Sequence, residues 1–257
     1  MKRTTLMYHD VVTDSAHCDD SGFTGAAAAH YKLDTALFER HLKALLATGL
    51  RFPAVQSSTD TDVILTFDDG GSSARHIGAL LDEHGMTGHF FITTARIGQP
   101  GFVTPADLRA LREAGHVIGS HSHTHPHDIS RLPRAQLESE WTQSLSILSG
   151  LLGQAIDCAS VPGGFTSESV KNAVSSCGIK YLFTSEPVTT IGKSAGCDVL
   201  GRYAMFRASS ERDAHHLALN KGFLRESQWL SWNAKRPLKR WARPAYALIR
   251  QWKLGAD

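Results

Sequence analysis

The sequence has no run of apolar residues long enough to cross a lipid bilayer as a helix, which takes about 18 to 20 residues. It also has little cysteine. Its four cysteines, Cys18, Cys158, Cys177 and Cys197, lie far apart and form no Cys-x-x-Cys pair. This spacing argues against a zinc ribbon, a thioredoxin-like motif and a disulfide scaffold. The chain therefore depends on an ordinary hydrophobic core.

The first residues, MKRTTLMYHDVV, lack the apolar stretch of a signal peptide, because Tyr8, His9 and Asp10 follow the basic flank too soon. We therefore expect the protein in the cytoplasm. With 42% hydrophobic and 20% charged residues, the 257-residue chain has the composition of a folded globular protein. A net charge of +2 says little about partners.

Short apolar runs rich in β-forming residues alternate with longer segments of helical period. Seven runs predict strands: Thr4–His9, Asp62–Phe67, Gly88–Thr93, His116–Ser120, Cys158–Val161, Lys180–Thr184 and Asp198–Tyr203. Such alternation is typical of a parallel sheet covered by helices, either a closed or partly closed barrel or a doubly wound open sheet. In both folds the active site lies at the carboxyl ends of the strands.

Two adjacent carboxylates, Asp68 and Asp69, follow the predicted strand Asp62–Phe67 in the stretch TFDDGG. Two carboxylates side by side just past a buried strand are unfavourable unless a cation or a proton separates their roles. Gly70 and Gly71 allow a sharp turn into the next helix. Taken alone, the pair fits a simple strand-to-helix turn with an aspartate cap better than it fits a catalytic site.

Four histidines stand at every second position in VIGSHSHTHPHD: His121, His123, His125 and His127. On a continuing strand all four would share one face. In a tight turn only pairs such as His121 and His125 would meet. A solvated histidine-rich loop is the third interpretation.

The acidic pair and the histidines both follow predicted parallel strands, so one face of a barrel would bring them together. One or two aspartate oxygens with two imidazoles make a normal shell for a catalytic divalent metal. We therefore expect a metal site at this face.

The stretch LTFDDG, followed some fifty residues later by His121-Ser122-His123-Thr124-His125-Pro126, resembles the NodB-homology polysaccharide deacetylases, carbohydrate esterase family four. The segments LMYHDVV, GHFFIT and SVPGGF extend the resemblance over roughly Thr4 to Tyr203. The resemblance implies an α/β fold, a distorted (β/α) barrel of about seven strands. It also implies a metal-dependent hydrolase that removes N-acetyl groups from a saccharide or glycan intermediate.

Within this resemblance, Asp68 would be the general base, and Asp69, His121 and His125 would hold one divalent metal ion. We expect zinc, although cobalt, nickel or iron would suit the same ligands. The metal would lower the pKa of water and polarise the acyl oxygen. His123 would be the free position of the motif and would face away.

The family's third motif, Arg-x-Pro-aromatic-Gly, corresponds here to Ser160–Gly164, where no arginine is present. The backbone N–H of Gly163, beside Pro162, would still serve as the oxyanion donor. We propose that Arg202, at the end of the last predicted strand, replaces the missing arginine that orients Asp68. A surface arginine is the alternative.

The family's final motif, Leu-x-His, supplies an acid for the leaving amine, but YAMF (Tyr203–Phe206) stands in its place. His9, at the end of the first strand, is another candidate for the acid, whereas His215 and His216 fall on a predicted helix. The unassigned acid leaves two alternatives open. One is a deformylase or other amidase for a lipid-linked or small-molecule sugar, and the other is a non-catalytic carbohydrate-binding relative.

We divide the chain into a catalytic domain, 1–220, and a basic, tryptophan-rich extension, 221–257, with nine Lys or Arg against two acids. Lys239–Trp252 could form a basic amphipathic helix at an anionic membrane surface, such as the inner face of the cell membrane. The alternative is a helix docked on the barrel. We expect no nucleic-acid partner, since no known nucleic-acid-binding motif accompanies the positive charge.

Overall fold

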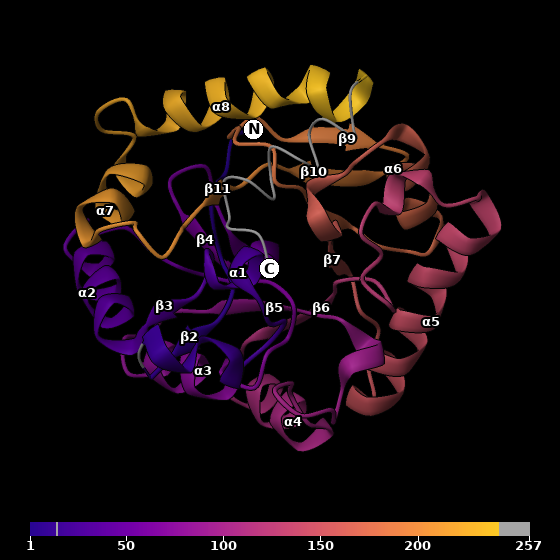
Figure 1. The fold of residues 1–257 in the computed structure, drawn as a ribbon, viewed down its shortest axis with the longest axis horizontal. Helices are drawn as coiled ribbons and strands as arrows, with labels where there is room; N and C mark the ends of the chain where they lie inside the picture. The colour runs from indigo at the N-terminus through magenta and orange to yellow at the C-terminus, as the bar shows by residue number, and fades with distance from the viewer. Residues whose placement is uncertain (14, 242–257) are drawn as a thin grey trace.

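The computed structural model describes residues 1–13 and 15–241, and Figure 1 shows a central sheet surrounded by helices. The strands are β1 (Thr4–Tyr8), β2 (Val11–Val12), β3 (Leu33–Asp34), β4 (Val63–Phe67), β5 (Gly88–Ile92), β6 (Val117–Ser120), β7 (Cys158–Ser160), β8 (Tyr181–Phe183), β9 (Gly192–Ser194), β10 (Cys197–Leu200) and β11 (Tyr203–Ala204). The helices are α1 (Ala26–Ala29), α2 (Thr35–Leu46), α3 (Ala74–Asp82), α4 (Pro105–Glu113), α5 (Arg134–Leu152), α6 (Glu168–Ser176), α7 (Glu211–Leu219) and α8 (Leu224–Trp241).

The main sheet has nine strands in the order β11-β1-β4-β5-β6-β7-β8-β10-β9. Every neighbouring pair from β11 to β10 is parallel, and β9 alone runs antiparallel, against β10. The predicted distorted (β/α) barrel is confirmed. The expected count of about seven strands is corrected to nine, because β9 forms a hairpin with β10 and the last predicted strand is divided.

That division occurs at Gly201 and Arg202, inside the run Asp198–Tyr203 that the sequence predicts as one strand. β10 pairs with β8, whereas β11 pairs with β1 at the other end of the sheet. Because two residues link them, Leu200 and Tyr203 have Cα atoms at most about 11 Å apart. The sheet must therefore curl until its two ends approach each other. Gly201 is required there, since a Cβ would lie 2.3 Å from the carbonyl oxygen of Glu186.

The strand register aligns the carboxyl ends of the central strands at one rim. All five residues of β4 are buried, as expected for a strand covered on both faces. Tyr8 of β1 pairs with Phe67 of β4, and Ser120 of β6 pairs with both Ile92 and Ala159. The residues that follow these strands therefore meet at one end of the barrel.

Local signals set the helix starts as the sequence indicates. The Asp34 side chain accepts a hydrogen bond from the Leu37 N–H at 2.7 Å and caps α2. Thr104 and Asp107 form a reciprocal capping box at the start of α4, with Pro105 in its first turn. These helices bury apolar faces on the outside of the sheet, with Phe38 and Leu42 of α2 fully buried.

The first half of α8 packs on the barrel edge beside β11 (Figure 1). The Gln228 amide pairs with both backbone groups of Ala204, at 3.0 and 2.9 Å, and so occupies the free edge of β11. Arg225 lies 5.0 Å from the ring centre of Tyr203. The predicted membrane-binding segment Lys239–Trp252 lies almost entirely outside the described residues and stays a prediction. None of the described helices is long and apolar enough to cross a membrane.

His89 of β5 makes stability depend on pH. Its buried ring accepts a hydrogen bond from the Val55 N–H through Nε2 and donates from Nδ1 to the Leu65 carbonyl, both at 2.9 Å, so the neutral form fits the core. Burial lowers its pKa to about 4. The unfolded chain binds this proton more readily, so stability should fall as pH drops from about 6.5 towards 4, by roughly 2 kcal/mol at pH 5.

Urea unfolding at pH 7 and pH 5 should show this loss in the wild type and a smaller loss in His89→Gln. The exposed His76 provides a matched control, and His76→Gln should keep the wild-type pH dependence. An unchanged pH dependence in His89→Gln would show that protonation of this ring does not limit stability.

Candidate active site

The two adjacent aspartates lie at the rim directly after β4. The Asp68 N–H donates to the Tyr8 carbonyl at 3.1 Å and continues the ladder, so its side chain stays buried inside the barrel mouth. Asp69 has a φ of 77°, a left-handed conformation that is uncommon for a residue with a side chain. Gly70 follows with a φ of 79°. The turn therefore directs the two carboxylates towards different partners.

Asp69, His121 and His125 form a compact group whose ligand atoms all lie within 4.8 Å of one another. Nε2 of His121 lies 3.4 Å from Oδ1 of Asp69, and Nε2 of His125 lies 3.5 Å from the same oxygen. Nδ1 of His121 lies 3.1 Å from the Ser160 carbonyl, which leaves Nε2 directed at Asp69. One carboxylate and two imidazoles are a suitable donor set for a divalent metal.

The pKa shifts in this group also fit a cation site. Burial, together with the nearby His121, lowers the pKa of His125 to about 4, so this ring is neutral at pH 7 and able to bind a metal. Burial would lower the pKa of His121 as well, but Asp68 and Asp69 outweigh it and raise that pKa. The two carboxylates therefore favour positive charge at this position.

The chain curls after Ser120, so the period-two pattern of the four histidines does not lie on a strand. Ser122 and His125 have φ values of 64° and 57°, and the rings of His121 and His125 come within 5.0 Å. Nδ1 of His123 lies 3.0 Å from the Thr94 hydroxyl, on the other side of the loop. The structure thus brings the i and i+4 histidines together and turns His123 away.

Asp68 forms a two-pronged ion pair with Arg202. The guanidinium donates to both carboxylate oxygens, at 2.7 and 2.8 Å, and also bonds Thr66 and the Thr184 carbonyl. Arg202 is fully buried, so the alternative of a surface arginine is wrong. It reaches Asp68 from the link between β10 and β11.

This pair determines the charge of Asp68. Burial alone would raise the pKa of Asp68, but the adjacent Arg202 guanidinium, with a contribution from His121, holds it well below its usual range. Asp68 is therefore ionised at neutral pH, and its two oxygens are held in one orientation.

Ser160 is a residue of this site to which sequence reasoning assigned no role. Its hydroxyl donates to Asp68 at 3.0 Å, lies 2.9 Å from Nδ1 of His121 and accepts from Arg202 at 3.1 Å. A hydroxyl can do this because it both donates and accepts. The available signal was its position at the end of β7, beside β6, the strand that His121 follows.

Pro162 and Gly163 lie in a short 3₁₀ turn, Pro162–Gly164, two residues beyond Ser160 at the same rim. Gly163 has a φ of 64°, and a Cβ there would come 3.1 Å from the His127 carbonyl oxygen. A glycine therefore suits this turn, while its backbone N–H is retained.

His9 follows β1, and its ring lies 4.5 Å from that of Tyr31. A positive charge on this ring would lower the pKa of both Asp68 and Asp69, so His9 lies near both carboxylates. Its Nδ1 is buried and has no hydrogen-bond partner among the described residues. His215 and His216 lie on α7, which packs against α2 in the outer layer.

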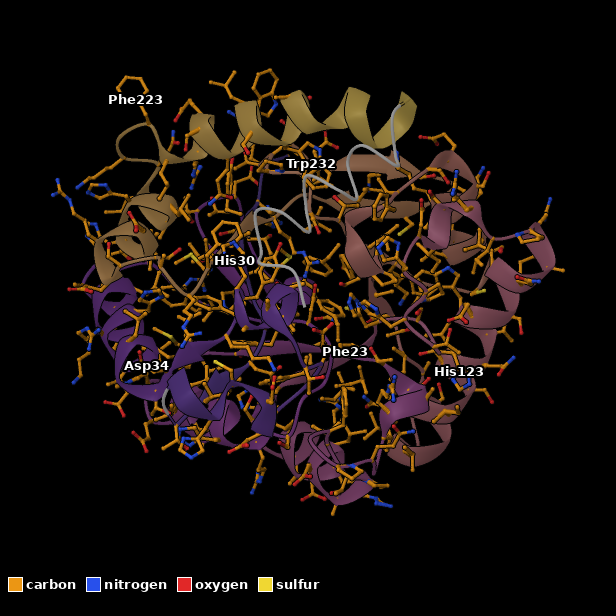
Figure 2. The ribbon with its side chains drawn as sticks, in the orientation of Figure 1. Phe23, His30, Asp34, His123, Phe223 and Trp232 are labelled. Carbon is orange, nitrogen blue, oxygen red and sulfur yellow. The ribbon has the colours of Figure 1, made fainter. Side chains whose placement is uncertain are left out.

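Phe23 is a second residue that sequence reasoning missed. Its ring centre lies 4.8 Å from that of His125, and Figure 2 labels it near the middle of the view. The buried ammonium group of Lys32 donates to the carbonyls of Cys18, Ser21 and Phe23 and fixes this part of the chain. No motif marks Phe23, because its position comes from a loop that returns over the rim.

Removal of either histidine of the candidate metal group should abolish metal binding. We expect His121→Ala and His125→Ala to weaken zinc affinity by about 100-fold or more, since each loses a direct ligand. His123→Ala, in the same loop, should stay within about threefold of wild type. Zinc titration against a chromophoric chelator measures this, and equal loss in all three variants would contradict the assignment.

Removal of Arg202 should destabilise the fold, because Asp68 would remain as a buried carboxylate without a counter-charge. For Arg202→Ala we expect a loss of about 3 to 5 kcal/mol in urea unfolding. The exposed Arg109 is the control, and Arg109→Ala should change stability by less than about 0.5 kcal/mol. Full stability together with full turnover in Arg202→Ala would show that the pair is dispensable.

Known proteins are similar to this chain in sequence, and solved structures are similar to it in fold. Residues 56–182 match the family model for polysaccharide deacetylase. Over 87 residues the chain is 39% identical to the peptidoglycan-N-acetylglucosamine deacetylase PgdA of Listeria monocytogenes. This alignment covers 33% of this chain and 18% of that protein. Over 181 residues it is 26% identical to the Bacillus subtilis protein YxkH, named for the same family, covering 66% and 62% of the two chains.

The chain thus spans less than a fifth of the length of PgdA, at 18%. Among solved structures, a polysaccharide deacetylase from Bacillus cereus superposes with a TM-score of 0.71 at 16% identity, over 85% of this chain and 69% of that one. This likeness supports the barrel fold. The match to the polysaccharide deacetylase family model, over residues 56–182, covers just under half of the chain.

Proposed function

We propose that the protein is a metal-dependent hydrolase that removes N-acetyl groups from a saccharide or glycan intermediate. The observation that carries this proposal is that two adjacent carboxylates have different partners. Asp68 is paired to Arg202, and Asp69 is directed at two histidines. The family-model match over residues 56–182 and the printed activity of PgdA, a peptidoglycan-N-acetylglucosamine deacetylase, support the substrate class.

Asp69, His121 and His125 would hold the divalent metal, for which we propose zinc, with cobalt, nickel and iron as alternatives. When bound, the metal supplies Lewis acidity, which lowers the pKa of water and polarises the acyl oxygen. Asp68 accepts the proton of the attacking water. Arg202 and Ser160 keep its carboxylate pointed into the mouth of the barrel.

Asp68 is ionised and ready to take a proton, but a carboxylate with so low a pKa is a weak base. Arg202 and Ser160 therefore fix the orientation of the Asp68 carboxylate, while the low pKa reduces its strength as a base. The backbone N–H of Gly163, beside Pro162, would donate to the oxyanion of the tetrahedral intermediate. His9, which follows β1 and lies near Asp68 and Asp69, is our candidate for the group that protonates the leaving amine.

A non-catalytic carbohydrate-binding role accounts less well for Asp68. A metal remnant needs Asp69 and the histidines, but it does not need a second buried carboxylate with its own fully buried arginine. A deformylase or another amidase would use the same residues, so only the released acid distinguishes these chemistries. Cytoplasmic residence and contact with a membrane through 221–257 remain proposals.

Asp68→Asn tests the proposal, because asparagine keeps the shape but cannot take the proton. We expect turnover to fall by about 10²- to 10⁴-fold while zinc affinity stays near wild type. The measurement is acetate release from a panel of N-acetylated saccharides and lipid-linked sugars, with and without chelator. Formate release would favour the deformylase, and sugar binding by a wild type that releases no acid would favour the binding protein.

A further inference from the structure

The loop that carries the two candidate metal-binding histidines is held in an unfavourable backbone conformation. Ser122 and His125 both have positive φ values, 64° and 57°, although neither is glycine. Such conformations persist only where surrounding contacts over-determine them. Within the loop, the His125 N–H donates to the Ser122 hydroxyl at 3.1 Å, and the Ser122 N–H donates to Ser120 at 3.1 Å.

One carboxylate outside the metal group accepts three hydrogen bonds from this loop. Glu140 of α5 accepts from the backbone N–H groups of His123 and Thr124, at 2.9 and 2.8 Å, and from the Thr124 hydroxyl at 2.6 Å. Hydrogen bonds to a charged acceptor are among the stronger ones in proteins. Figure 2 shows His123 beside α5, as these contacts require.

The helix that carries Glu140 is itself firmly placed. Trp141 and Leu137 of α5 are fully buried in an apolar cluster with residues of β7 and α6. The hydroxyl of Ser144 lies 2.7 Å from that of Ser120, the last residue before the loop. The hydrogen bonds to Glu140 therefore fix the middle of the loop relative to a firmly packed helix.

The opposite side of the loop is held by the segment after β5. The Ala95 N–H donates to the His123 carbonyl at 2.9 Å, and Thr94 contacts the His123 ring. His123 and Thr124 are thus clamped between this segment and α5. The clamp lies between the two candidate ligands, so any shift of it moves His121 and His125 relative to each other.

We propose that Glu140 is a positioning residue for the metal site: it binds no metal itself but holds the His121–His125 loop in the conformation that brings both imidazoles to Asp69. This inference rests on the proposed metal-dependent function. The side chain of Glu140 and the residue His123 are only partly buried, and Thr124 is exposed, so water can reach the freed donors when the carboxylate is removed. The loss should therefore appear in metal binding more than in folding.

Two substitutions separate geometry from charge. Glu140→Ala removes all three hydrogen bonds. Glu140→Gln can keep them, because its carbonyl oxygen can accept the two N–H groups while its amide donates to the Thr124 hydroxyl. The matched control is Glu138→Ala, two residues away on the same helix, where Glu138 pairs only with Arg134 among the contacts described for it.

The experiment measures zinc affinity by competition with a chromophoric chelator, the absorption spectrum of the cobalt(II) form, and the thermal midpoint of the metal-free protein. For Glu140→Ala we expect about 10-fold or greater loss of zinc affinity and an altered cobalt spectrum. Glu140→Gln should stay within about threefold of wild type. The metal-free midpoints of Glu140→Ala and Glu138→Ala should agree within about 4 °C.

Wild-type zinc affinity in Glu140→Ala would overturn the inference. Equal losses in Glu140→Gln and Glu140→Ala would also overturn it, because the charge rather than the hydrogen bonds would then be responsible. A wild type that binds zinc but releases no acetate contradicts the proposed function alone and leaves the Glu140 comparison valid. A wild type that binds none of zinc, cobalt, nickel and iron contradicts both.

Discussion

The buried ion pair between Asp68 and Arg202 is the interaction on which the rest of the site depends. Removing two charges from water is expensive, and here the geometry compensates with paired hydrogen bonds at 2.7 and 2.8 Å and further partners in Thr66, Ser160 and the Thr184 carbonyl. The pair is possible only because the sheet curls until β10 and β11 come close enough for two residues to link them. Arg202 is one of these two residues. The link that closes the barrel therefore also carries the side chain that orients the candidate base.

Two neighbouring carboxylates acquire different chemistry because the backbone turns between them. Asp68 continues the strand ladder and faces a guanidinium, which keeps it ionised. Asp69, in a left-handed conformation, faces two imidazoles. Ser160 contacts both Asp68 and His121 and so links the two halves. The local structure thus separates the proposed proton acceptor, Asp68, from the proposed metal ligand, Asp69, within a single dipeptide.

Segments outside the strands complete the surroundings of this rim. Lys32 binds three carbonyls of the loop that places Phe23 against His125, and Glu140 of α5 holds the histidine loop from the other side. Gln228 of α8 covers the free edge of β11, close to the link that carries Arg202. These contacts join residues of different segments of the chain, so no local pattern predicts them. Each depends on where loops and helices pack against the sheet.

Hydrophobic period and strand ends are local properties, so the residues alone predicted the alternation of strands and helices and the two clusters at the carboxyl ends of strands. They left a barrel and an open sheet as alternatives, and the family resemblance favoured the barrel. The sequence also indicated Arg202 as a partner for Asp68. Only the tertiary structure decided that the last strand divides at Gly201 and Arg202, that the histidine pattern belongs to a curled loop, and that Ser160, Phe23 and Glu140 join the site. The physical reason is that these features depend on long-range closure and packing, which a one-dimensional pattern does not contain.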